Sequence, residues 1–141
     1  MPGIEPRADA RTVMLVALGG ALGTLARYEL SLVAPVRPGT FPATTLVINV
    51  VGALLLGVLL GAVLRSAPDD HVMRPLLGVG FLGGFTTFST FTVETIQLVR
   101  HEQAALAAIY VIASIAIGLA AARAGERLVH ATPRLIPEDE T

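Results

Sequence analysis

Residues Gly78–Glu94 read GVGFLGGFTTFSTFTVE, which combines glycines, phenylalanines and hydroxyl side chains between apolar residues. The pair Gly83-Gly84 predicts a break in a helix, because glycine loses the most backbone entropy when it becomes helical. From Thr86 onward the segment predicts a second helix. At about 100° per residue, this helix carries polar side chains on one side and aromatic rings on the other. The polar stripe is Thr86, Ser89, Thr90 and Glu94, and the aromatic stripe is Phe88 and Phe91.

The composition of the chain is typical of a membrane protein. Of its 141 residues, 53% are hydrophobic and 15% are charged, and the apolar residues form four long blocks. A helix needs about 20 apolar residues to cross the hydrocarbon core, and each block has roughly that length. The sequence therefore predicts an all-α membrane protein, a single membrane domain over residues 1–141 with polar tails at 1–11 and 123–141. The four predicted spans are Thr12–Leu32, Ala43–Leu64, Leu76–Val99 and Ala104–Ala122.

The composition also excludes several classes of function. The formal net charge is −1 and the arginines are scattered, so no nucleic-acid partner is expected. The chain has no cysteine for thiol chemistry and no lysine for a Gly-Lys-Ser/Thr phosphate loop. Neither a Ser/His pair nor paired carboxylates fall inside the predicted spans. We therefore do not expect an enzyme.

Arginines are distributed unevenly between the two ends of the predicted spans. Seven lie on the side that holds both tails and the second connection, and two lie on the other side. By the positive-inside rule, both termini are predicted to be cytoplasmic. Arginines before the first block also resemble a secretory signal peptide, but no soluble domain follows, and a first span is the better interpretation. The larger group is Arg7, Arg11, Arg65, Arg74, Arg123, Arg127 and Arg134, and the smaller is Arg37 and Arg100.

Polar side chains at membrane depth are candidates for function because they are costly to bury there. Asn49 is the first, with Thr45 one turn before it on the same face; an interhelical hydrogen bond is the simpler alternative. Five hydroxyls within Thr86–Thr92 are harder to explain by packing and suggest a polar path. Carbonyl groups freed by a break at Gly83–Thr86 could coordinate a cation. The amide groups of the restarting helix would instead suit an anion.

The remaining candidates each have a structural alternative. Phenylalanine rings are usually core residues, although their positive edges can also meet an anion. Tyr110, Ser114 and Gly118 recur every four residues and form either a hydroxyl face or a packing face. Glu94 is expected to snorkel near the end of its helix. Arg27 is either an interfacial anchor or a positive charge at a pore mouth, and the neighbouring Tyr28 and Glu29 favour the mouth.

Small residues also recur at a four-residue spacing in every predicted span. Such spacings let two helix backbones approach closely, either within one subunit or between subunits. The pairs are Gly19/Gly23, Gly57/Gly61, Gly80/Gly84 and Ser114/Gly118.

Three motifs stand in order along the chain: GTLARY at Gly23–Tyr28, INVVG around Asn49, and GGFTTFSTF at Gly83–Phe91 followed by Glu94. With these motifs the chain resembles the small fluoride channels of bacteria, of the CrcB/Fluc type, from its first span to its fourth. The resemblance implies passive export of cytoplasmic fluoride, which relieves the toxicity of HF that enters and ionises. It further implies an antiparallel, dual-topology dimer with two fluoride pores.

The resemblance also implies ion-binding residues. The backbone carbonyls of Gly83 and Thr86 from both subunits would hold a structural sodium ion (Na⁺) at the dimer centre. Arg27 would lie in the pore vestibule. The residues that match the anion pore are Asn49, Phe88, Phe91, Thr90, Tyr110 and Ser114.

Two other functions and one question of partnership remain open at this point. A small multidrug-resistance-type four-helix transporter would need an embedded acid in its first span, but the first block has none before Glu29. A non-transporting assembly subunit would explain the small residues but not the hydroxyl run. The strong arginine bias fits a subunit that inserts one way and pairs with an oppositely oriented homologue, rather than a homodimer.

Overall fold

The computed structural model describes residues 9–66 and 71–131, and every regular element in this part of the chain is helical. Four stretches of it are long and apolar enough to cross a membrane, at Ala10–Val33, Ala43–Val63, Arg74–Arg100 and Ala104–Ala131. The prediction of four spans is confirmed, and the chain is a multi-pass membrane protein. The elements are α1 (Ala10–Val33), α2 (Ala43–Ser66), η1 (Arg74–Leu82), α3 (Gly83–Phe85), α4 (Phe88–Arg100) and α5 (Ala104–Ala131).

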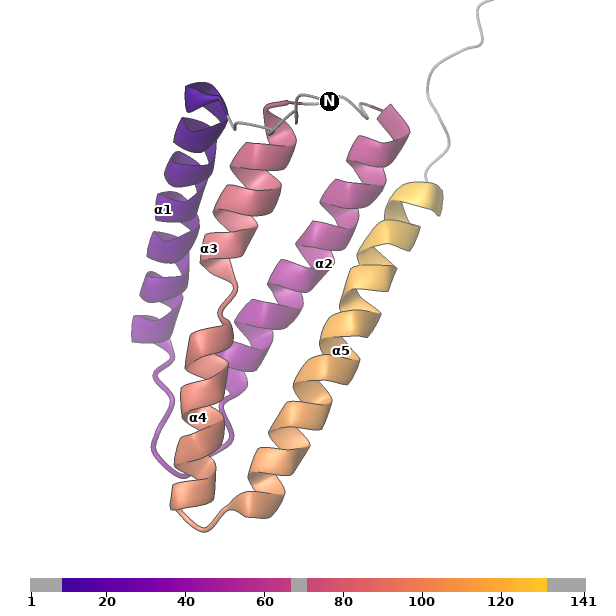
Figure 1. The fold of residues 1–141 in the computed structure, drawn as a ribbon. Coiled ribbons are helices and arrows are strands. Elements are labelled where there is room, and N and C mark those ends of the chain that lie inside the picture. Colours follow the sequence, from indigo (N-terminus) through magenta and orange to yellow (C-terminus); the bar gives the residue numbers. More distant parts are fainter. Residues whose placement is uncertain (1–8, 67–70, 132–141) are drawn as a thin grey trace, which may run out of the picture.

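The helices run alternately up and down, so that α1 begins and α5 ends at the same end of the bundle (Figure 1). The side chain of Asp9 starts α1 by accepting a hydrogen bond of 2.8 Å from the amide of Thr12, which supplies one of the partners that the first turn lacks. Toward the C-terminus of the chain, α5 continues to Ala131, beyond the predicted end of the fourth span. The rest of the two predicted tails, at 1–8 and 132–141, lies outside the described residues.

The third span is made of three helical pieces and an extended link. The π-helix η1 leads into α3, and the chain is extended at Thr86 (φ −77°, ψ 158°) and Thr87 (φ −144°, ψ 124°) before α4 begins. The predicted position of the break is therefore wrong, since Gly83 is helical (φ −65°, ψ −35°) and α3 includes Gly84. Gly84 serves packing instead. A Cβ atom on Gly84 would collide with the carbonyl oxygen of Gly20 in α1.

Glycines bring two pairs of helices into backbone contact. A Cβ on Gly19 would collide with the carbonyl of Leu76, so α1 lies directly against η1. A Cβ on Gly57 would collide with the carbonyl of Ala122, so α2 lies equally close to α5. These small-residue spacings therefore pack helices within one subunit. Gly118 differs, because a Cβ there would meet nothing within 4 Å.

The buried core is small and lies near the turn between α4 and α5. It consists of Leu98, Ala107 and Tyr110, with Phe41 and Phe91 among the side chains packed against it. Most other large apolar side chains are exposed in the single chain, as expected for helices that face lipid or another subunit.

The two classes of glycine predict opposite effects of the same substitution. Gly57→Ala should lower the melting temperature of the protein in detergent, because the new methyl group forces α2 away from α5. Overpacking of this kind costs about 1–3 kcal/mol. Gly118→Ala is the matched control and should leave the melting temperature unchanged or slightly raised, since alanine favours helix. Equal melting temperatures for Gly57→Ala and the unmodified protein would contradict the backbone contact.

Candidate functional site

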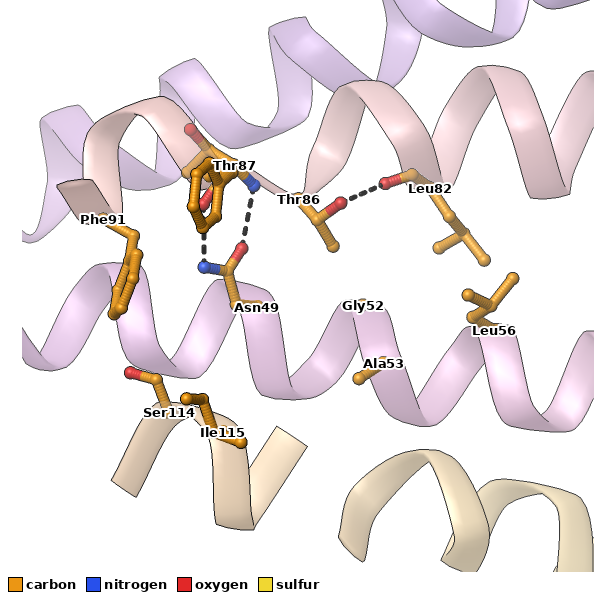
Figure 2. A pocket seen from close by; sticks show the side chains of 11 residues that line it. Asn49, Gly52, Ala53, Leu56, Leu82, Thr86, Thr87, Phe91, Ser114 and Ile115 are labelled. Carbon is orange, nitrogen blue, oxygen red and sulfur yellow. Dashed lines mark hydrogen bonds between the residues drawn. The ribbon is translucent and has the colours of Figure 1, made fainter. Parts of the chain in front are cut away.

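A cavity of about 360 Å³ lies beside the extended link of the third span (Figure 2). Its walls come from α2, from the end of η1, from the link, from α4 and from α5. The residues that line it are Asn49, Gly52, Ala53, Leu56, Leu82, Thr86, Thr87, Phe88, Phe91, Ser114 and Ile115. Four of the six residues predicted for an anion pore are therefore brought together, namely Asn49, Phe88, Phe91 and Ser114.

Asn49 holds the extended link through both ends of its amide (Figure 2). Its Nδ2 donates to the carbonyl of Thr87 at 2.9 Å, and its Oδ1 accepts from the amide of Thr87 at 2.8 Å. This is the interhelical hydrogen bond that the sequence left open as the simpler alternative. A primary amide has two N–H groups, so the bond to Thr87 leaves the second N–H of Asn49 for another acceptor.

The link deprives several carbonyl oxygens of the donors that a continuous helix would supply, among them those of Gly83 and Thr86. In such a helix the amide of Thr87 would bond to Gly83, but it donates to Asn49 instead. The amide of Thr90 would bond to Thr86, but it donates to Oγ1 of Thr87 at 3.1 Å. Gly83 is also exposed, and a Cβ there would meet nothing within 4 Å. The residues predicted to hold a cation by their carbonyls thus have oxygens that fit this role.

Aromatic rings and an unpaired hydroxyl complete the cavity. The ring centroids of Phe88 and Phe91 lie 5.8 Å apart, and Phe88 is 80% exposed in the single chain. Across the cavity, Oγ of Ser114 is buried and has no hydrogen-bond partner within the described residues. Buried polar atoms are nearly always paired, so the free hydroxyl of Ser114 is available to donate to a molecule in the cavity.

Tyr110 and Thr45 bind Glu94 rather than facing this cavity. The Tyr110 hydroxyl and Oγ1 of Thr45 each donate to one carboxyl oxygen of Glu94, both at 2.8 Å. All three side chains are buried. The expectation that Glu94 snorkels is wrong, because two hydroxyl groups replace the water that its carboxyl group would otherwise seek.

A second cavity, of about 250 Å³, lies on another side of α4, under the connection between α1 and α2. Thr90 and Glu94 line it, whereas the two phenylalanines line the first cavity. The predicted separation of a polar and an aromatic stripe is therefore seen for α4. Thr86 is the exception, since it precedes α4 in the extended link and lines the first cavity with the rings.

Thr87 is a functional residue that the sequence analysis did not single out. Its backbone binds Asn49, and its hydroxyl caps α4 by accepting from the amide of Thr90. A threonine directly before a restarting helix is a typical N-cap signal, and this signal would have placed the end of the break. Arg27, which was predicted for the pore vestibule, lies directly before this link. Its Nε donates to the carbonyl of Gly84 in α3 at 3.1 Å.

Comparison with known proteins identifies a family for this chain. The chain matches the family described as "CrcB-like protein, Camphor Resistance (CrcB)" over residues 14–126. It is 49% identical to "Fluoride-specific ion channel FluC 3" of Streptomyces avermitilis over 110 residues, which are 78% of this chain and 54% of that protein. It is 46% identical to "Fluoride-specific ion channel FluC 1" of Mycolicibacterium paratuberculosis over 121 residues, which are 86% of this chain and 92% of that protein.

A third relative is "Fluoride-specific ion channel FluC 2" of Rhodococcus jostii, at 49% identity over 118 residues, 83% of this chain and 97% of the relative. The family match spans the break, Asn49 and the aromatic residues of α4. On its sequence and its architecture, this chain belongs to the CrcB-like family of membrane proteins.

Proposed function

We propose that the chain is a subunit of a fluoride-specific ion channel, which lets cytoplasmic fluoride leave the cell by passive flow and so reduces its toxicity. The unpaired Ser114 hydroxyl in the cavity carries this proposal, because it is a donor with no acceptor among the described residues. The spare N–H of Asn49 lines the same cavity. The relatives named as fluoride channels support the choice of ion.

The chemistry of the cavity suits a small, strongly hydrated anion. Such an ion enters a narrow pore only if donors replace its water, and here the donors are one hydroxyl and one amide N–H. The edges of the Phe88 and Phe91 rings carry partial positive charge and can add weak contacts. A larger halide would not fit the same spacing of donors, so the water it loses in the passage would not be replaced. The chain therefore acts as a selective path and not as a catalyst.

We further propose that two subunits pair in an antiparallel, dual-topology dimer. The exposed ring of Phe88 and the open surface at Gly83 are suited to contact with a second subunit. The rings and the hydroxyls of α4 face different cavities, so one helix could serve two pores. The arginine count favours cytoplasmic termini for this chain and, as its partner, an oppositely oriented homologue rather than a second copy.

The carbonyl oxygens of Gly83 and Thr86 are proposed as ligands of a structural sodium ion between the two subunits. The diverted amides of Thr87 and Thr90 support this assignment, because they leave both oxygens without their helical donors. Bound there, sodium would supply positive charge that holds the two links together. In this chain the ligands would be backbone oxygens, since the described residues contain no group of three His, Asp or Glu side chains that could hold a metal.

The first prediction of the proposed function concerns selectivity. Liposomes that carry the reconstituted channel should release fluoride but not chloride, as measured with two ion-selective electrodes. Phe88→Ile should abolish fluoride release, because an aliphatic side chain has no positive ring edge. Phe81→Ile is the matched control, since Phe81 lies in η1 outside the cavity and should retain release. Comparable release of both ions would exclude a fluoride-specific channel.

The second prediction separates ion binding from folding. Ser114→Ala should lower fluoride release by about threefold to tenfold, the effect of one lost hydrogen bond, without a change in melting temperature. Asn49→Asp should lower both, because aspartate cannot donate to the carbonyl of Thr87. Ser31→Ala, at the exposed end of α1, should change neither quantity. Full fluoride release by Ser114→Ala would contradict the role of the Ser114 hydroxyl, on which the proposed function depends.

The third prediction concerns the partner. The chain expressed alone should insert in one orientation and show little fluoride release. Co-expression with a homologue of opposite arginine bias should restore fluoride release. Protease-accessible tags on each terminus would report the orientation. If the chain alone forms a dimer with full fluoride release, the heterodimer is wrong and the homodimer is right.

A further inference from the structure

Arg27 on α1 binds a backbone oxygen of α3, directly before the extended link. Its Nε donates to the carbonyl of Gly84 at 3.1 Å. Oγ1 of Thr24, one turn earlier on α1, donates to the same oxygen at 3.4 Å. Arg27 is half-buried in the single chain, so much of its side chain lies against protein.

Gly84 needs such a partner because of the break that follows it. In a continuous helix its carbonyl would pair with the amide of Phe88, but the extended residues Thr86 and Thr87 separate the two. An unpaired carbonyl at membrane depth is strongly unfavourable. The end of η1 and α3 also carries the negative pole of the helix dipole, which a guanidinium group complements.

The position of Arg27 is set by close backbone packing. A Cβ on Gly23 would collide with the carbonyl of Phe81, and a Cβ on Gly84 would collide with that of Gly20. Because α1 packs this closely against η1 and α3, the rigid guanidinium of Arg27 is held beside the carbonyl of Gly84. A lysine ammonium at the end of a flexible stem would not reproduce this geometry.

We propose that Arg27 is a positioning residue that caps the first half of the third span, at the C-terminal end of α3. It holds the end of α3 at Gly84 while Asn49 holds the link at Thr87, and together they keep the break open. The carbonyls of Gly83 and Thr86 and the cavity amide of Asn49 then stay in place. The inference rests on the proposed channel function, and it differs from the pore-mouth role, in which only the charge of Arg27 matters.

The test compares Arg27→Lys, which keeps the charge, with Arg27→Gln, which removes it. Fluoride release from liposomes is measured at low and at high ionic strength, and amide hydrogen exchange of residues 85–88 is measured on the same preparations. A cap predicts that both variants exchange about tenfold faster or more and lose fluoride release alike at both ionic strengths. Arg100→Lys, at the exposed end of α4, is the control and should match the unmodified protein.

A pore-mouth charge predicts a different pattern. Arg27→Lys would then retain fluoride release and normal exchange, and the release lost in Arg27→Gln would depend on salt, because salt screens the field of an exposed charge. That result would overturn the cap. If the Arg27 variants do not fold, Thr24→Val tests the same carbonyl, and unchanged exchange at residues 85–88 would also overturn it. Absence of fluoride release from the unmodified chain reconstituted together with its oppositely oriented homologue would refute the channel, while the exchange data would still test the cap.

Discussion

Within a bilayer, each backbone N–H and C=O group must find its partner inside the protein, and the third span of this chain meets that constraint with side chains. The helix stops at Phe85 and begins again at Phe88. Across the gap, Asn49 pairs with both backbone groups of Thr87, and Arg27 binds the carbonyl of Gly84. Both α1 and α2 are therefore bonded to the third span at its interruption, and the shape of the cavity beside it depends on these bonds.

The same bonds determine which polar groups remain for an ion. Thr87 uses its hydroxyl to cap α4, and Asn49 uses one N–H and its oxygen on the link. What remains in the larger cavity is the hydroxyl of Ser114, one N–H of Asn49 and the ring edges of two phenylalanines. A passage with so few donors binds a small anion weakly at several points, which favours conduction over tight binding.

On another side of α4 the polar groups are satisfied by one another. Glu94 accepts hydrogen bonds from Thr45 and Tyr110, and the three side chains join α2, α4 and α5. A buried carboxyl group with two donors is stable where a single one would not be. This cluster therefore stabilises the helix that presents Phe88 and Phe91 to the larger cavity.

The four spans, the helical class and four of the residues that line the larger cavity follow from the sequence, because length, hydropathy and isolated polar residues act locally. Asn49, Ser114 and the two phenylalanines were candidates for one site from the sequence, and they line the same cavity. The position of the break did not follow from the sequence, since Gly84 packs against α1 within a helical turn and the link lies at Thr86 and Thr87. The bonds from Tyr110 to Glu94 and from Arg27 to Gly84 depend on how the helices pack, because these pairs join residues 16 and 57 positions apart, whose contact no local pattern encodes.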